Sequence, residues 1–165
     1  MILDIVTHPN PILRKKAQNV ADISHASIQK LIDDMIPTMY MKDGIGLAAP
    51  QVGESLQITV IIPDHTKFEE YKKNASEALV VINPKIIRHS LLTNKDQEGC
   101  LSVPHVVGTI KRWNWVTVAF FDRHGQKHKM RVKDYVARIF QHEIDHLNGT
   151  LFIDKAKNIL QVKEL

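Results

Sequence analysis

Residues 141–146 read Gln-His-Glu-Ile-Asp-His, which places two imidazoles four positions apart with a carboxylate directly after the first. Residues at positions i and i+4 share one face of a helix, so His142 and His146 can both reach one metal ion. Glu143 would then lie beside that metal, where its carboxylate can exchange a proton with water. This is the His-Glu-x-x-His pattern of metal-dependent hydrolases. For this motif alone, the alternative is two ordinary histidines on a solvated helix face.

The sequence around this motif predicts a helix. Asp134 can cap its start, and Gly149 follows its end. The apolar positions between them are Val136, Ile139, Phe140 and Leu147. A second helix is predicted over residues 24–42, where apolar residues recur at helical spacing. Ser24 or Ser27 could cap that helix, Gly44 would end it, and Pro37 should bend or interrupt it.

The residues between the two helices predict β-strands. The candidate strands are residues 57–62, 79–82, 85–92, 113–121 and 127–133. Asn83-Pro84 is expected to stop the second of these, and Trp113 and Trp115 to alternate on one face of a sheet. The predicted fold is α+β, with mostly antiparallel β-sheets packed around a central metal-binding α-helix and an N-terminal helix. A length of 165 residues suits one domain spanning 1–165.

Composition narrows the class of protein. No apolar run approaches the roughly 20 residues that cross a bilayer, and no secretory signal is visible, so no membrane association is expected. A single cysteine excludes an internal disulfide framework and suits a reducing compartment. The net charge of +4 is spread over scattered Lys and Arg, which indicates a solvated surface and no specific nucleic-acid binding.

The lone Cys100 supplies a candidate third metal ligand. It lies in the segment Glu98–Ser102, where a turn is expected, and a thiolate is a strong ligand for zinc or ferrous iron. Two imidazoles and one thiolate leave one coordination position open for water, as in catalytic sites. The alternative is that Cys100 is a small buried hydrophobe. A further segment, residues 44–53, offers glycines that allow close backbone approach, and Gln51 as an uncharged donor.

Three segments of the chain resemble the signature motifs of the peptide deformylase family. They are residues 44–51 (GIGLAAPQ), 98–102 (EGCLS) and 141–146 (QHEIDH), and they occur in the family's order at similar separations. The similarity extends from Pro9 to Phe152. It implies an α+β fold around a metal-bearing helix, and an enzyme that removes the formyl group from the N-terminal formyl-methionine of new polypeptides.

The resemblance also implies a role for each matching residue. The metal ligands would be Cys100, His142 and His146. Glu143 would be the general base and then acid, while Gln51 and the backbone N–H of Leu101 would hold the oxyanion. Ile45 and Gly46 would meet the substrate backbone as an added strand.

The remaining candidate residues are assigned to the substrate pocket. They are Gly99, Glu98, Tyr135 and Ile139. Glu98 has an alternative role as a cap of the Cys100 loop, and Ile45, Tyr135 and Ile139 are plain core residues if each is taken alone. Asp145 could orient Arg112 or face solvent, and Asp43 could also pair with Arg112.

The cofactor implied by the resemblance is one divalent metal ion, Fe²⁺, although the same ligands accept zinc, nickel or cobalt. The expected partners are N-formyl-methionyl nascent peptides.

Many relatives carry an acidic residue and then an arginine after the position of Pro104, whereas this chain has His105-Val106-Val107. The segment 155–165 is short and weakly basic, so ribosome docking through such a tail is not supported. The expected location is the cytoplasm of a bacterium, or an organellar matrix if a transit peptide has been removed.

Two other functions compete with this interpretation. In a metallopeptidase of the metzincin type, a third histidine follows the second by six residues, but Phe152 stands at that position. In the type that uses a distant glutamate as the third ligand, only Glu164 could serve. A catalytically inactive binding protein with a structural metal would require a fourth protein ligand. It would need neither Gln51 nor Glu143.

Overall fold

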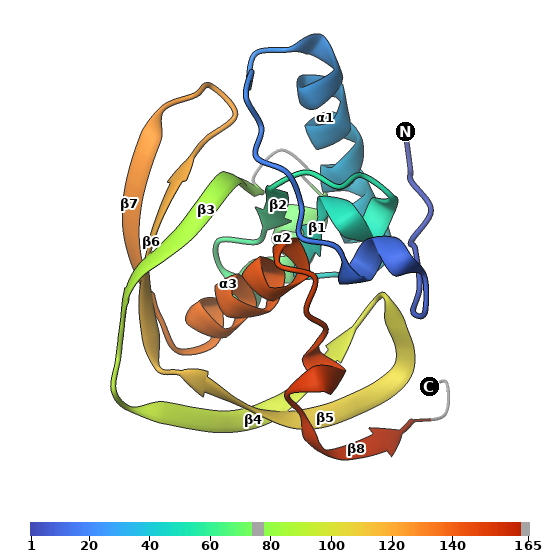
Figure 1. Cartoon of the computed structure of the whole chain (residues 1–165), viewed down its shortest axis with the longest axis vertical. Helices are drawn as coiled ribbons and strands as arrows, with labels where there is room; N and C mark the ends of the chain where they lie inside the picture. The colour runs from blue at the N-terminus through green and yellow to red at the C-terminus, as the bar shows by residue number, and fades with distance from the viewer. Residues whose placement is uncertain (74–77, 163–165) are drawn as a thin grey trace.

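The computed structural model describes residues 1–73 and 78–162 of the chain (Figure 1). The α-helices are α1 (Ala26–Met41), α2 (Phe68–Lys73) and α3 (Asp134–Leu147). The strands are β1 (Gly46–Ala48), β2 (Ile58–Ile61), β3 (Leu79–His89), β4 (Thr93–Cys100), β5 (Val103–Trp113), β6 (Trp115–Phe121), β7 (Lys127–Lys133) and β8 (Lys157–Gln161). Short 3₁₀ helices span Pro11–Arg14, Ala49–Val52, His65–Lys67 and Phe152–Asp154.

Two antiparallel sheets enclose α3. The larger sheet has the order β1-β2-β3-β6-β7, and the smaller has the order β4-β5-β8. In Figure 1, α3 lies between the large sheet and the hairpin of β4 and β5, and α1 covers the end of the large sheet near β1 and β2. The predicted α+β fold, with antiparallel sheets around a histidine-bearing helix and an N-terminal helix, is confirmed.

Helix α3 is central because most of its surface is buried. Its apolar residues Ala137, Ile139, Phe140 and Ile144 pack against the inner face of β6 and β7, while its histidines contact Glu98 and Cys100 of β4 in the smaller sheet. The helix begins at Asp134 and the preceding Lys133 is the N-cap, so the expected capping role of Asp134 is wrong by one position. Gly149 ends the helix as predicted, with a left-handed φ of 74°.

Strand β3 corrects one sequence prediction. Residues 79–82 and 85–92 were expected as two strands separated by Asn83-Pro84, but β3 continues from Leu79 to His89. Asn83 has a φ of 51°, and the register against β6 shifts between Ile82 and Lys85. The side chain of Asn83 is hydrogen-bonded to the backbone N–H and C=O of Val20, which holds this bulge in place.

The tryptophans and the first helix also differ from expectation. Trp113 ends β5 and Trp115 begins β6, so they belong to different sheets rather than to one face of a single strand. Helix α1 is capped by His25, whose ring nitrogen accepts a hydrogen bond from the Ser27 N–H, and it runs through Pro37 without interruption. None of the helices in the described ranges is both long and apolar enough to cross a membrane.

Candidate active site

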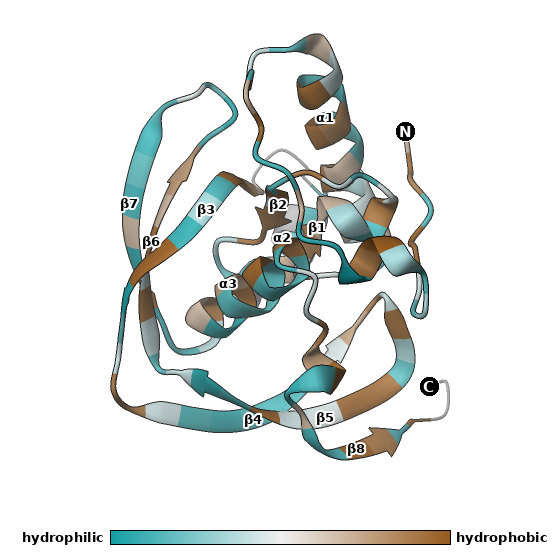
Figure 2. Cartoon of the chain, viewed as in Figure 1, coloured by the Kyte–Doolittle hydropathy of each residue, from teal (hydrophilic) through white to brown (hydrophobic). Residues whose placement is uncertain are grey.

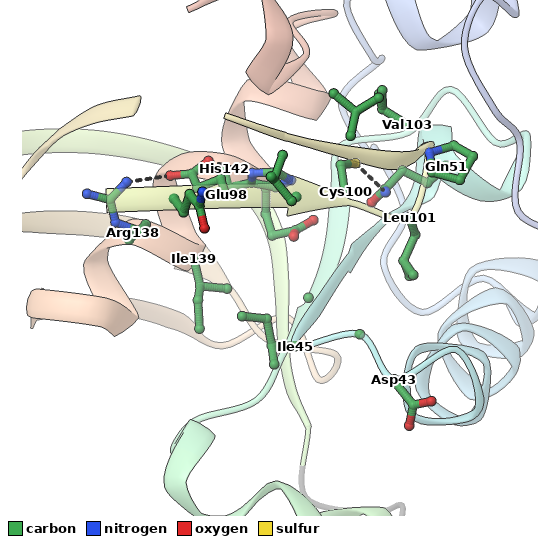
Figure 3. Close-up of a pocket in the computed structure, with 18 of the residues that line it drawn as sticks. Asp43, Ile45, Gln51, Glu98, Cys100, Leu101, Val103, Arg138, Ile139 and His142 are labelled. Carbon is green, nitrogen blue, oxygen red and sulfur yellow. Dashed lines mark hydrogen bonds and ion pairs between the residues drawn. The ribbon is translucent and has the colours of Figure 1, made fainter. Parts of the chain in front are cut away.

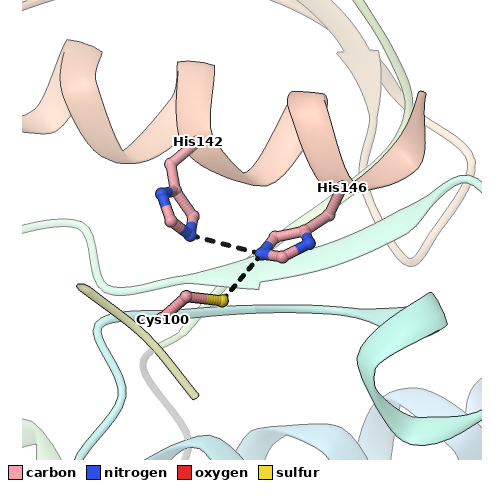
Figure 4. A group of neighbouring side chains, drawn as sticks. All are labelled: Cys100, His142 and His146. Atoms are coloured by element: carbon pink, nitrogen blue, oxygen red, sulfur yellow. Dashed lines mark hydrogen bonds between the residues drawn. The ribbon is translucent and has the colours of Figure 1, made fainter. Parts of the chain in front are cut away.

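Three metal-ligand atoms converge between α3 and the end of β4. Nε2 of His146 lies 3.2 Å from Nε2 of His142 and 3.2 Å from Sγ of Cys100 (Figure 4). All three donor atoms lie within 4.8 Å of one another. A tetrahedral ion with ordinary metal–nitrogen and metal–sulfur bond lengths needs donor separations of about 3.3–3.6 Å. The donor set and its spacing therefore fit one metal ion, with a fourth position left for a small ligand.

The hydrogen bond on the far side of His142 determines its tautomer. Nδ1 of His142 lies 2.9 Å from Oε2 of Glu98, so Nδ1 carries the proton and Nε2 presents its lone pair to the metal position. His146 is almost fully buried, and burial lowers its pKa well below the usual value, which keeps the ring neutral. Burial opposes protonation of His142, but its contacts with Cys100 and Glu98 outweigh that effect and raise its pKa to about 10. A metal ion must therefore displace a proton from Nε2 of His142, whereas His146 is already neutral.

Glu98 is held by a buried network of charges. Its carboxylate accepts hydrogen bonds from Nε and Nη2 of Arg112, each at 2.9 Å, and from Nη1 of Arg138 at 2.7 Å (Figure 3). Burial raises the pKa of Glu98, but its hydrogen bonds to Arg112 and His142 outweigh that effect and hold the pKa well below its usual range. The carboxylate is therefore charged and occupied by protein partners.

The ion pairs around Arg112 answer which partners Asp145 and Asp43 have. Arg112 also donates to Asp145 at 2.6 Å, which confirms that Asp145 orients this arginine. Asp43 does not pair with Arg112 but lies 2.5 Å from Nζ of Lys72. Arg138 was not among the site residues predicted from the sequence. It lies within the predicted helix, where no motif distinguishes it from an ordinary surface arginine.

Glu143 lies on the buried side of α3, next to the metal position. Burial raises the pKa of its carboxyl to about 7, although nearby His142 opposes the rise. The hydroxyl of Thr59 on β2 lies 3.4 Å from its Oε2. A carboxyl group that titrates near neutral pH is suited to both accepting and returning a proton.

Gly46 makes room for this carboxylate. A Cβ at position 46 would lie 2.7 Å from Cδ and 2.9 Å from Cγ of Glu143, and closer still to Oε1. Strand β1, which contains Gly46, is also an edge strand, because among the described residues it pairs with β2 alone. The glycine thus lets the backbone of an edge strand touch the side chain of Glu143.

This contact yields a prediction for Gly46→Ala. The added methyl group must displace the Glu143 carboxylate, and a displacement of a catalytic group by about 1 Å can lower the rate by up to about a hundredfold. We therefore expect turnover to fall by about tenfold to a hundredfold, with metal binding retained. Gly125→Ala is the control, because a Cβ there meets nothing within 4 Å. It should only lose about 1 kcal/mol of stability through its left-handed φ. Full activity in Gly46→Ala would remove the proposed steric role.

Gln51 and Leu101 approach the metal position from the opposite side to the helix. Oε1 of Gln51 accepts from the Ala48 N–H at 2.8 Å, which aims its amide group so that Nε2 lies 3.6 Å from Sγ of Cys100 and 3.3 Å from Oγ of Ser102. Leu101 follows Cys100 in the two-residue connection between β4 and β5. The expected turn is thus confined to Leu101 and Ser102, and the residues before it form a strand that the sequence did not predict.

A cavity of about 470 Å³ opens next to the ligand cluster. Every residue predicted to contact substrate lines it, as do the ligands Cys100 and His142. The predicted residues are Ile45, Gly46, Glu98, Gly99, Tyr135 and Ile139. Figure 3 shows Ile45 and Ile139 on one side of this cavity, with Cys100 and Gln51 at its other end.

The structure adds cavity residues that the sequence did not indicate. Val162 reaches the cavity because the chain continues from β8 alongside β5, where the Val162 N–H donates to the carbonyl of His105 at 2.9 Å. His105 itself lines the cavity and has a φ of 61°. No local pattern marks Val162, since only the pairing of β8 with β5 brings it there.

The fold and the site together define a metal-dependent hydrolase. The sequence profile of the polypeptide deformylase family matches residues 2–161. A peptide deformylase of Symbiobacterium thermophilum is 46% identical over 163 residues, which cover 99% of this chain and 70% of that protein.

Solved structures agree with this match. The crystal structure of a peptide deformylase from Legionella pneumophila has a TM-score of 0.85 and 39% identity, and the match covers 96% of this chain and 88% of that one. A class I type b peptide deformylase from Acinetobacter baumannii, solved with Met-Ala-Ser bound, has a TM-score of 0.83 and 32% identity over 94% of this chain and 98% of that one. The chain belongs to the polypeptide deformylase family and has peptide deformylase activity.

Proposed function

We propose that this chain, acting as one catalytic domain over residues 1–165, removes formyl groups from N-formyl-methionyl nascent peptides. The observation that carries the proposal is the convergence of three donor atoms, a buried carboxylate and an aimed amide at the end of one cavity. Cys100, His142 and His146 would hold one divalent metal ion. Fe²⁺ is our proposed native metal, and Zn²⁺, Ni²⁺ or Co²⁺ would fit the same ligands.

The protein groups divide the chemistry between them. A bound metal lowers the pKa of a coordinated water and polarises a carbonyl oxygen. Glu143 takes a proton from the attacking water and returns it to the leaving amine nitrogen. Nε2 of Gln51 and the N–H of Leu101 donate to the oxygen on which negative charge develops. The C–N bond of the formamide then breaks, and formate and a free methionyl N-terminus are the products.

The substrate backbone would add to the edge of β1 at Ile45 and Gly46, opposite Gly99 at the end of β4. Main-chain pairing of this kind holds peptides of any sequence, while pockets select individual side chains. The methionine side chain would fill the apolar part of the cavity, formed by Ile45, Ile139 and the ring of Tyr135. The bound Met-Ala-Ser of the Acinetobacter baumannii enzyme supports a peptide product of this kind.

We assign Glu98 a positioning role instead of the substrate contact expected from the sequence. Its two carboxylate oxygens accept hydrogen bonds from Arg112, Arg138 and His142, so they are engaged before substrate arrives. Groups that fix a metal-bound histidine in this way typically change metal affinity or activity by about 10–100-fold when removed.

We propose a bacterial-type cytoplasm as the location of the protein, in preference to an organellar matrix. The support for this proposal is that relatives at this level of identity are bacterial. Residues 157–161, which lie in the segment considered for ribosome docking, form strand β8 paired with β5 and not a helix.

The proposed substrate is tested by comparing formyl-Met-Ala-Ser with acetyl-Met-Ala-Ser and formyl-Ala-Ala-Ser. We expect rapid formate release from the first, no acetate release from the second, and a lower kcat/KM for the third, because alanine leaves the apolar pocket unfilled. One missing methylene group in an apolar pocket corresponds to about 10–200-fold discrimination, and alanine lacks more than one of the groups that methionine would bury. Equal rates on the two formyl peptides would exclude a methionine pocket.

Replacement of Gln51 tests the proposed oxyanion contact. We expect Gln51→Ala to lower kcat by about 10²–10³-fold, because one donor to the developing charge is lost. Metal content should be unchanged, since Gln51 supplies none of the three ligand atoms. The variant also leaves the buried Ala48 N–H without its acceptor, so activity should be measured below the melting temperature. A loss confined to KM would assign Gln51 to ground-state binding instead.

A further inference from the structure

The outer face of the large sheet carries a concentration of positive charge. Strands β3, β6 and β7 together contain six Lys and Arg residues and no Asp or Glu. The whole chain has a net charge of only +4, so the remainder of the molecule is slightly acidic. The net positive charge of the chain is therefore concentrated on these strands, although most of its Lys and Arg residues lie elsewhere beside acidic residues.

The strand register places all six of these cations on one face. Cross-strand partners project to the same side of a sheet, and alternate residues of a strand share a face. The β6 residues Val116, Val118 and Phe120 pack against α3, so their neighbours Trp115, Thr117, Ala119 and Phe121 belong to the opposite face. The cations paired with these four positions are Lys133, Arg131, Lys129 and Lys127 on β7, and Lys85 and Arg88 on β3.

These six side chains are exposed, and none of them has a carboxylate partner within 4.0 Å in the parts of the chain that the structure describes. Figure 1 shows β3, β6 and β7 along one side of the molecule, with α3 on their inner side only, and Figure 2 shows β7 coloured as hydrophilic over most of its length. We call this surface of Lys85, Arg88, Lys127, Lys129, Arg131 and Lys133 the basic face.

The spacing of the basic face suits an extended anionic chain. Alternate residues of an antiparallel strand are about 6.8 Å apart, so the four β7 cations form a row of about 20 Å. Arg88 and Arg131 flank the small Thr117 in the adjoining row. A line of unpaired cations of this length can neutralise several phosphates of a nucleic-acid strand, with release of the counterions.

An aromatic group favours single-stranded RNA over a lipid surface. The guanidinium of Arg131 lies 3.8 Å from the ring centroid of Trp115, which is partly exposed at the edge of the basic face. Bases of a single strand stack on such aromatic and guanidinium planes. Cations attract a protein to an anionic lipid surface, but stable attachment is strengthened by large apolar side chains that insert between lipids, and the middle of this face carries Thr117 and Ala119.

We propose that the basic face binds the phosphate backbone of single-stranded RNA without reading its sequence. The proposal concerns a surface outside the catalytic cavity, and it does not depend on the proposed substrate or metal. Its function would be to hold the enzyme near RNA-containing assemblies while the active site remains free.

The test is fluorescence anisotropy of a short labelled polyuridylate titrated with the metal-loaded protein. We expect binding that weakens from about 50 to about 200 mM salt, with a log–log slope near −3, or about −0.7 for each of four phosphate contacts. Lys127→Glu/Lys129→Glu should lower the affinity by about tenfold or more and make the slope shallower by about 1.

The matched control is Lys95→Glu/Lys111→Glu, which makes the same charge change on two exposed cross-strand partners of the smaller sheet. It should change RNA affinity by less than about threefold. None of Lys127, Lys129, Lys95 and Lys111 lines the catalytic cavity, so both variants should keep full deformylase activity, which verifies their fold. Equal losses in the two variants, or no binding by the wild type, would overturn the proposal. Binding to phosphatidylglycerol vesicles without binding to RNA would also overturn it.

Discussion

Glu143→Gln is expected to lower kcat by about 10²–10⁴-fold while the protein still binds one metal ion per chain. The carboxylate lies beside the metal position and has a pKa near neutral, because burial raises it to about 7. Glutamine has the same shape and can keep the contact with the Thr59 hydroxyl, but it cannot accept and return a proton. The measurement is formate release under saturating substrate, together with metal analysis of the same sample.

Glu143→Asp is the matched comparison for this variant. It keeps a carboxylate but withdraws it by one bond, or about 1.5 Å. Its turnover should therefore fall between those of the wild type and Glu143→Gln. Wild-type kcat in Glu143→Gln would show that another group transfers the proton, and loss of metal from this variant would show that Glu143 supports the ligand cluster itself.

Cys100→Ala is expected to lose the metal and, with it, all measurable deformylase activity. The thiolate is one of three ligands, and its Sγ lies 3.2 Å from Nε2 of His146, so its removal leaves only the two imidazoles. The loss of packing is small, since Cys100 is only partly buried against a small apolar cluster. Metal per chain after dialysis, and the thiolate-to-metal absorption band of the cobalt form, measure the effect directly.

This result separates a deformylase from a peptidase of the His-Glu-x-x-His type. In a peptidase, Cys100 would have no role, and Cys100→Ala would keep its metal. Cys100→Ser provides a control of nearly equal size, in which a weaker oxygen ligand should retain part of the metal affinity. Unchanged metal content in both variants would contradict the ligand set described above.

The elements with strong local patterns could be predicted from the sequence. Helix α3 lies where its apolar residues predicted it, β2 where a β-branched apolar run did, and β7 where the turn at residues 122–125 did, and Gly149 ends α3 as expected. The errors arose where tertiary contacts override a local signal. Asn83-Pro84 usually stops a strand, but hydrogen bonds from Asn83 to Val20 stabilise a bulge within β3. Strand β4 was missed because its sequence, TNKDQEGC, is polar and lies at the edge of the smaller sheet.

The candidate site was more predictable than the strands that carry it. Cys100, His142 and His146 converge as expected, because two of them are one helical turn apart and the third lies in a matching motif. The partners of the charged residues were not predictable. A sequence does not show that Arg138 and Arg112 meet at Glu98, since these residues come from three different elements. The basic face was likewise hidden, because its cations come together only through the strand register.

The most direct test of the central claim is to titrate Fe²⁺ anaerobically into the metal-free protein while measuring formate release from a formyl-methionyl peptide. We predict that activity rises linearly and reaches its plateau at one metal ion per chain, since the structure brings together a single Cys/His/His ligand set in the residues it describes. The absence of formate release from a protein shown to hold one metal ion per chain would contradict the account.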